Sequence, residues 1–130
     1  MKKLLNKEFL KWNFEFSNKS IQAEKLFSCF FEGSMTVWAV SAENKKFKII
    51  LMKALLNFLN KDLDKKIIFD CRSVLEIDSS GLAMLLSCLR QASQLGYEPR
   101  LVHVPQKALD LIEAQGLRML IKPYVFSMTD

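Results

Sequence analysis

Hydrophobic and polar residues alternate over the first part of the chain. The segment LKWNFEF (Leu10–Phe16) places aromatic residues at every second position, with Asn13 and Glu15 between them. This two-residue period is typical of a half-buried strand. A second strand is predicted over Lys25–Glu32, so that the N-terminal strands occupy about residues 9–32.

The middle of the chain changes to a helical period. Apolar residues at 37, 40, 47, 51, 55 and 58 have roughly helical spacing within Thr36–Asn60, and Thr36 is a credible N-cap. The VWAVSA part of this segment fits a strand equally well. The next apolar run, Ile67–Phe69, is short and continuous, as in a strand covered on both faces, and it is predicted to lie at the centre of the sheet.

Helices and strands continue to alternate towards the C-terminus. Leu82–Leu95 has apolar residues at three- and four-residue steps, and Gly96 follows where a left-handed C-terminal cap is expected. A short strand is predicted over Arg100–Val104, and Pro105 suits the first position of a final helix that runs towards Leu117. This order predicts an α/β fold with a mixed sheet of about four to five strands covered by three or more helices.

The stretch EIDSSGLAMLL (residues 76–86) joins the central strand to the leucine-rich helix. Asp78 or Ser79 is expected at the start of that helix, where free backbone N–H groups need side-chain oxygens. Gly81 allows the backbone or a partner to approach closely in the first turn. By themselves, these residues indicate a well-capped core helix.

The leucine-rich helix has two distinct faces when its residues are projected at about 100° per residue. The leucines at 82, 85 and 89 gather on one side with Ala92. The opposite face carries no formal charge and is predicted to expose Met84 beside Ser80, with Arg90 at its margin. Small uncharged residues around an apolar one suit a docking site better than a solvated face. The predicted face comprises Ser80, Met84, Ser87, Gln91 and Gln94.

Length and composition indicate one soluble domain. With 130 residues and 50% hydrophobic content, the chain can form a core without disulfides or metals, so residues 1–130 are expected to be a single domain. The chain has three cysteines, Cys29, Cys71 and Cys88, and each has apolar neighbours in the sequence. An odd number of widely spaced cysteines favours reduced thiols in the core of a cytosolic protein. No apolar segment is long enough to cross a bilayer, and the N-terminus lacks the apolar region of a signal peptide.

Several kinds of chemistry lack the residues that they need. A zinc site would require the three cysteines to converge on His103, the only histidine, although no short paired spacing occurs among them. No G-x-S-x-G elbow surrounds Ser79 or Ser80, and no glycine-rich phosphate loop is present. The net charge of +5 comes largely from scattered lysines without a nucleic-acid motif. We therefore expect no enzymatic activity, no metal or other cofactor and no nucleic-acid partner.

The run IIFDCRSVLEIDSSGLAMLL, followed by RLVHVPQKALDLIEAQGLRMLI, resembles the STAS domain, the fold of anti-sigma factor antagonists and of small transporter-associated subunits. The resemblance covers about residues 27–121. Its most specific part is the D-S-S-G-L of Asp78–Leu82, which lies between the central strand and the second helix as it does in the family. The resemblance implies a STAS-like fold and a protein-interaction function.

Two subgroups of this family compete. The STAS subunit of the Mla (maintenance of lipid asymmetry) phospholipid ABC transporter reads D-[ST]-x-G-L-A-x-L-L, and its important hydroxyl corresponds to Ser79. That subunit is cytoplasmic and binds the transporter's ATPase, and the H-x-P of His103–Pro105 is similar to a feature of this subgroup. In the anti-sigma factor antagonists, a partner kinase phosphorylates the serine before the glycine, which corresponds to Ser80.

The first half of the chain departs from both subgroups, because the span from Gly33 to Asp70 is longer than usual and MTVWAV replaces an acidic L-D. The resemblance implies a bacterial cytoplasmic subunit that binds and regulates the ATPase of an Mla-type complex, with a phosphorylation-switched antagonist as the alternative. Such a subunit reaches the inner face of the membrane only through its partner and does not insert. The residues expected to bind the partner or to be phosphorylated are Asp78, Ser79, Ser80, Gly81, Met84, Ser87 and Gln91.

Overall fold

The computed structural model describes residues 9–19, 24–59 and 66–126, and these form a five-stranded sheet with helices packed against it. In chain order the elements are β1 (Leu10–Lys19), β2 (Glu24–Met35), α1 (Val37–Leu59), β3 (Lys66–Ile77), α2 (Ser79–Gln94), β4 (Glu98–Val102), α3 (Gln106–Ala114), α4 (Arg118–Ile121), the 3-10 turn η2 (Lys122–Tyr124) and β5 (Val125–Phe126).

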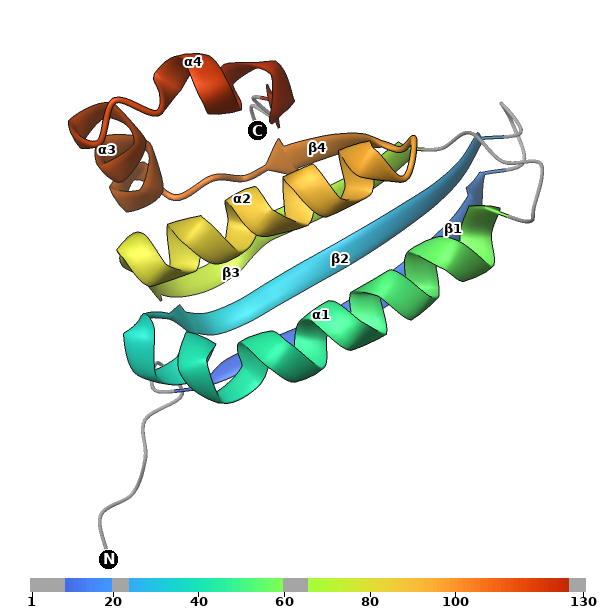
Figure 1. The fold of residues 1–130 in the computed structure, drawn as a ribbon, viewed down its shortest axis with the longest axis horizontal. Helices are drawn as coiled ribbons and strands as arrows, with labels where there is room; N and C mark the ends of the chain where they lie inside the picture. The colour runs from blue at the N-terminus through green and yellow to red at the C-terminus, as the bar shows by residue number, and fades with distance from the viewer. Residues whose placement is uncertain (1–8, 20–23, 60–65, 127–130) are drawn as a thin grey trace, which may run out of the picture.

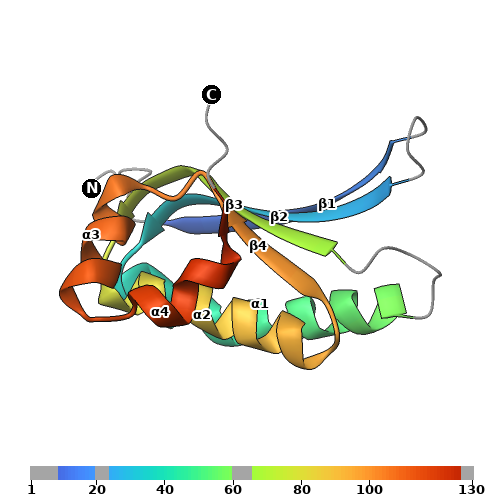
Figure 2. The same cartoon turned by 90° about the horizontal axis from the view of Figure 1, so that it is seen from above.

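The strands lie side by side in sequence order, from β1 at one edge to β5 at the other. β1 is antiparallel to β2, whereas β2 to β5 are parallel to one another. Each parallel connection therefore advances in the same direction, and right-handed crossovers then place their helices on the same face of the sheet. α1 and α2 lie on one face, and α3 and α4 lie on the far side of α2 from α1 (Figures 1 and 2). This architecture confirms the predicted α/β fold with a mixed sheet.

The first two strands form an antiparallel pair. Trp12 and Phe14 are half-buried and pack on Phe47 of α1, with ring centroids 5.1 Å and 6.1 Å apart. The polar residues at 13 and 15 are exposed, which confirms the alternation. The second strand was predicted to end at Glu32, but β2 continues to Met35. Gly33 has a positive φ of 91°, and the register with β3 shifts at this point, so the glycine forms an irregularity within the strand.

The ambiguous VWAVSA segment is helical and forms the first turns of α1. Val40, Phe47, Leu51 and Leu55 are buried and hold the helix on the sheet. Val37 was predicted to belong to this apolar stripe, but it is the first residue of α1 and is 46% exposed. No helix in the described ranges is long and apolar enough to cross a membrane.

β3 lies between β2 and β4, as predicted for the continuous apolar run. Ile67 and Phe69 are completely buried on the face that carries α1 and α2. Ile68 points to the opposite face and is only half-buried, because the two long helices cover one face. The expectation of a strand covered equally on both faces is therefore wrong at this residue.

The C-terminal third follows the prediction with shifted boundaries. β4 ends at Val102, two residues earlier than expected, because His103 has a positive φ of 53° that breaks the extended backbone. Gly96, with a φ of 87°, follows the end of α2 as predicted, and Pro105 immediately precedes α3. The short elements α4, η2 and β5 were not predicted, since two to four residues carry no readable period.

Candidate functional site

Asp78 connects the end of β3 to the start of α2. Its backbone is extended (φ −124°, ψ −169°), and its Oδ1 atom accepts hydrogen bonds from the N–H groups of Ser80 at 2.8 Å and Gly81 at 3.2 Å. Both donors belong to the first turn, where a helix leaves its N–H groups without internal partners. The predicted capping is confirmed, with Asp78 as the cap and Ser79 as the first helical residue.

The same carboxylate also binds the start of α1. Its Oδ2 atom accepts a hydrogen bond from the N–H of Val37 at 2.9 Å, across 41 residues of sequence. The backbone N–H of Asp78 donates to the carbonyl of Met35 at the end of β2, at 3.2 Å. Thr36 precedes α1 as predicted, but its hydroxyl pairs with that of Ser34 at 2.8 Å. Asp78 therefore caps two helices, a role that the sequence analysis did not predict.

Gly81 is buried where α2 crosses the ends of β2 and β3. A β-carbon at this position would lie 2.6 Å from the β-carbon of Met35 and 2.8 Å from Cγ1 of Ile77, and would overlap the carbonyl oxygen of Met35. Such distances are far inside van der Waals contact, so the helix can approach the strands closely only with glycine here. The structure thus confirms the predicted close approach of the backbone.

The two serines of the motif lie in different surroundings. Ser79 is exposed, and its hydroxyl accepts a hydrogen bond from Nε2 of Gln115 at 2.6 Å. Gln115 follows α3 directly, so this bond links the start of α2 to the end of α3. Ser80 is half-buried one position further along the helix.

The exposed face of α2 differs from the predicted one at Met84. This side chain is only 2% exposed, so the prediction of an exposed methionine beside Ser80 is wrong. The cause is the position of α2, which packs against α1 as well as the sheet and therefore buries a wider arc than the leucine stripe. Ser87 and Gln91 are half-buried, and the remaining exposed residues are Ser79, Ala83, Arg90 and Gln94.

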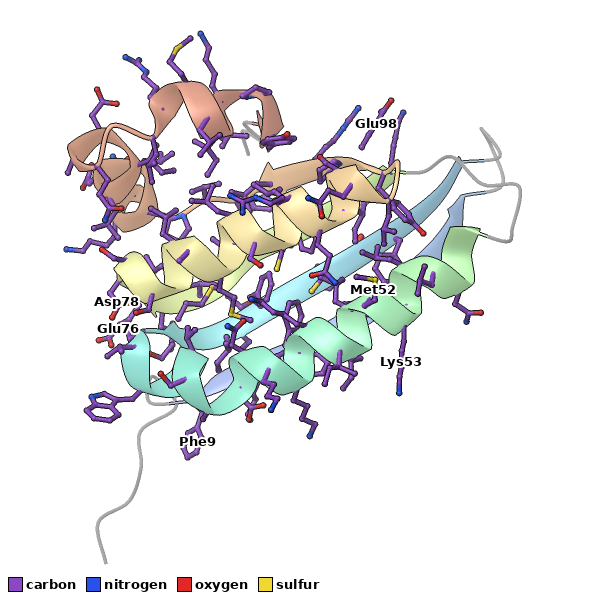
Figure 3. All side chains as sticks on the ribbon, in the orientation of Figure 1. Phe9, Met52, Lys53, Glu76, Asp78 and Glu98 are labelled. Carbon is purple, nitrogen blue, oxygen red and sulfur yellow. The ribbon has the colours of Figure 1, made fainter. Side chains whose placement is uncertain are left out.

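Large apolar side chains are exposed next to this helix start, and the sequence analysis did not identify them. Trp38, in the first turn of α1, is 84% exposed, and Leu75 near the end of β3 is 64% exposed. The N–H of the neighbouring Val37 is bound to Asp78, so Trp38 lies at the same end of the molecule as the motif. Figure 3 shows this end, marked by Glu76 and Asp78, where α1 and α2 both begin. The signal available in the sequence was that Trp38 lies two residues from the buried Val40 and thus off the apolar stripe.

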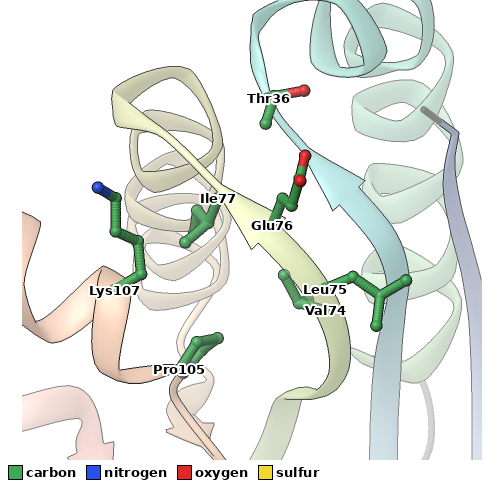
Figure 4. A pocket seen from close by; sticks show the side chains of 7 residues that line it. All are labelled: Thr36, Val74, Leu75, Glu76, Ile77, Pro105 and Lys107. Atoms are coloured by element: carbon green, nitrogen blue, oxygen red, sulfur yellow. The ribbon is translucent and has the colours of Figure 1, made fainter. Parts of the chain in front are cut away.

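A shallow pocket of about 340 Å³ opens beside the motif, between the end of β3 and the start of α3. Figure 4 shows Pro105 and Lys107 on one side of β3 and Thr36 on the other. The lining offers apolar surface with a few polar groups at its edge, which suits an apolar side chain of a partner. The lining residues are Thr36, Val74, Leu75, Glu76, Ile77, Pro105 and Lys107.

His103 pairs with Arg72. Its Nε2 atom is 3.0 Å from a guanidinium nitrogen of Arg72, and the same nitrogen lies 3.4 Å from the carboxylate of the buried Asp70. A guanidinium group can only donate, so the imidazole nitrogen is the acceptor in this bond. The single histidine is thus engaged with Arg72 and is not placed as a base for Ser79 or Ser80.

The three cysteines are free thiols in the core, as predicted. Burial raises the pKa of Cys29, and the neighbouring Cys88 and Cys71 raise it further. Burial, with a smaller effect of the Asp70 carboxylate, raises the pKa of Cys71 to about 12, and burial also raises that of Cys88. Thiols of this kind are unreactive. In the described ranges, no three His, Cys, Asp or Glu side chains are grouped so as to hold a metal ion.

Comparison with known proteins identifies the fold family. The solved structures to which the chain is similar include the following two. One is that of the anti-sigma factor antagonist SpoIIAA in its unphosphorylated form, at 17% identity and a TM-score of 0.53, covering 91% of this chain and 90% of the other. The second is the Bacillus cell fate determinant SpoIIAA in the phosphorylated form, at 15% identity and a TM-score of 0.54, covering 91% and 93%. No curated protein matches by sequence. The STAS domain family matches residues 18–127, and the chain therefore belongs to the STAS domain family.

Proposed function

We propose that this STAS domain is a non-enzymatic interaction subunit that docks a protein partner at the start of α2. The observation that carries this proposal is that Trp38 and Leu75 are exposed at the end of the molecule where Ser79, Ser80 and Ala83 begin the small, uncharged face of α2. A large exposed aromatic ring near small residues is typical of an anchor in a protein–protein interface, whereas a surface that contacts only water gains nothing from exposing such a ring. The engagement of His103 with Arg72 leaves the serines without a histidine base, which supports binding over catalysis.

The partner that we propose is the ATPase of an Mla-type phospholipid ABC transporter. The motif D-S-S-G-L-A-M-L-L at Asp78–Leu86 supports this assignment, because the serine directly after the aspartate is the important hydroxyl in that subgroup. Ser79 is the more exposed of the two serines and lies in the first turn of α2. Its bond to Gln115 also brings the end of α3 into the proposed contact surface.

A second function is favoured by the similarity to SpoIIAA, whose solved structures are those of an anti-sigma factor antagonist. In this alternative, the partner is a kinase that phosphorylates Ser80, and the phosphorylation causes the kinase to dissociate from this domain. A phosphate there would lie at the N-terminus of α2, where the helix dipole favours negative charge. Phosphorylation would then leave the fold intact while it placed an unpaired charge in the contact surface.

The test is calorimetric binding of serine variants to the purified ATPase and, separately, to the kinase. Ser79→Asp and Ser80→Asp should keep a normal circular dichroism spectrum yet weaken binding at least about tenfold, or roughly 1.4 kcal/mol. If the ATPase is the partner, Ser79→Ala weakens binding more than Ser80→Ala. The reverse ranking, measured with the kinase, supports the antagonist function.

The matched control is Ser93→Ala, at the far end of the same helix, which should change affinity less than about twofold. Unchanged binding in all four serine variants would contradict both functions and leave the motif with its capping role alone. Failure of the wild-type chain to bind the ATPase would exclude the Mla-type function specifically.

A further inference from the structure

A shallow groove runs between α1 and α2 on the side of these helices away from the sheet. It has a volume of about 580 Å³, and α1 contributes an apolar floor through Ile49 and Met52. Ile49 is 51% exposed, so this floor is open to contact. Figure 3 shows Met52 on the side of α1 that faces α2, and Lys53 extending from α1 on the side away from α2. The groove is lined by Lys48, Ile49, Met52, Lys53, Ser87, Arg90, Gln91 and Gln94.

Positive charge surrounds this floor without compensation. Of the residues that the structure describes, Lys48, Lys53 and Arg90 line the groove, and no carboxylate does. Within the part of the chain that the structure describes, none of the three cations forms an ion pair. Three uncompensated cations around apolar side chains form a surface that attracts negative charge.

The groove is continuous with the proposed docking face. Ser87, Gln91 and Gln94 line it from α2, and the Nε2 atom of Gln91 donates to the carbonyl of Lys48 at 3.5 Å. A partner that contacts Ser79 and Ser80 and continues along α2 therefore reaches the groove next. A cleft between two parallel-running helices matches an amphipathic helix, which presents apolar and charged residues at helical spacing.

We propose that the α1–α2 groove binds an acidic amphipathic helix of the partner protein. Its apolar residues pack on Ile49 and Met52, and its carboxylates pair with Lys48 and Arg90. This inference rests on the proposed docking function of α2 and specifies the chemistry of the partner segment. Specificity comes from the charge, because a basic or neutral helix would leave the cations of the groove unpaired.

The test uses a synthetic amphipathic helix of about 16 residues, with leucine on one face and glutamate on the other, and a matched peptide with glutamine in place of glutamate. Amide chemical shifts of the full chain are followed during titration. The glutamate peptide should bind at least about tenfold more tightly and shift the amides of residues 48–53 and 87–94. Its affinity should fall steeply when sodium chloride is raised from about 50 to about 500 mM.

Charge reversal separates the groove from general attraction by a basic protein. Lys48→Glu combined with Arg90→Glu should reduce binding of the glutamate peptide at least about tenfold, while Lys46→Glu, on an exposed position of α1 outside the groove, should cost less than about twofold. Equal binding of the two peptides, shifts that map elsewhere, or an equal loss in Lys46→Glu would overturn the proposal. Capture by phosphatidylglycerol vesicles in place of the peptide, lost in the double variant, would also overturn it and indicate a lipid surface.

The same variants separate this inference from the proposed function. If the ATPase binds wild type and the double variant equally, the groove inference fails while the docking function stands. If the glutamate peptide binds in the groove and the ATPase does not bind at all, the groove stands and the ATPase function fails.

Discussion

Asp78 holds three elements together at the end of the sheet where the proposed docking surface lies. Its two carboxylate oxygens accept hydrogen bonds from three backbone N–H groups, one in α1 and two in α2. Its own N–H is bound to Met35 of β2. Hydrogen bonds from a carboxylate to free N–H groups are among the stronger ones in proteins, and they also act on the helix dipole. This residue therefore positions Ser79 and Trp38 relative to each other.

Replacing Asp78 should destabilise the domain more than the loss of an ordinary cap. Asp78→Ala removes the caps of two helices, and because one cap contributes about 1 kcal/mol, we expect a loss of about 2 kcal/mol in the free energy of unfolding. Urea denaturation of the purified variant measures this loss. Asp110→Ala is the control, because that carboxylate accepts an exposed hydrogen bond from the side chain of Gln106, and the substitution should cost less than about 0.5 kcal/mol. A loss no greater in Asp78→Ala than in the control would contradict the double cap.

At the scale of elements, α2 separates the core of the protein from the surface proposed to bind a partner. Leu82, Leu85, Leu89 and Ala92 are buried against the sheet, as their spacing predicted. Met84 and Cys88 extend the buried arc towards α1. The face left exposed is consequently narrow and begins at Ser79, which concentrates the small residues of the motif at its N-terminal end.

The two faces of α2 should respond oppositely to the same new charge. Leu85→Asp places a carboxylate at a completely buried position, at a cost of several kcal/mol against a total stability of roughly 5–15 kcal/mol, and should abolish soluble expression. Ala83→Asp places the same group on the exposed face and should give a folded protein with an unchanged melting temperature. A folded, thermally unaltered Leu85→Asp variant would contradict the assignment of the buried face.

At the scale of the whole molecule, four ionisable groups are kept protonated by the core. Burial raises the pKa of the three thiols, which pack where β2, β3 and α2 meet. Burial also raises the pKa of Tyr97, whose hydroxyl donates to the carbonyl of Leu55 at 2.5 Å and thus links the start of β4 to the end of α1. Each of these groups therefore loses its proton at a lower pH in the unfolded chain than in the folded protein.

Stability should therefore fall as the pH rises above about 9. Above the usual thiol pKa of 9.0, a thiol loses its proton in the unfolded state, whereas the folded state retains it. For Cys71 the folded state retains the proton until the pH approaches the raised pKa of about 12. The unfolded state then binds fewer protons, so the free energy of unfolding decreases by about 1 kcal/mol for each thiol between pH 8 and pH 10. Urea unfolding at these two pH values, with a reducing agent present, measures the decrease. Cys71→Ala should reduce it by about one third, and an unfolding free energy that is the same at both pH values would contradict the burial of the thiols.

The sequence alone determined the order and type of the long elements, because periods of two and of about 3.6 residues record which face of each strand or helix is buried. It also determined the family resemblance and the capping chemistry of Asp78–Gly81, because these depend on residues adjacent in the chain. Only the tertiary structure decided that VWAVSA is helical, that Met84 is buried and that Trp38 is exposed. Each of these depends on how α1 and α2 pack beside each other on one face of the sheet, and a single helical projection contains no information about a neighbouring helix. The hydrogen bond from the N–H of Val37 to Asp78, across 41 residues of sequence, was likewise decided only by the tertiary structure. Such a contact exists only after the strands β2 and β3 bring the starts of both helices to one end of the molecule.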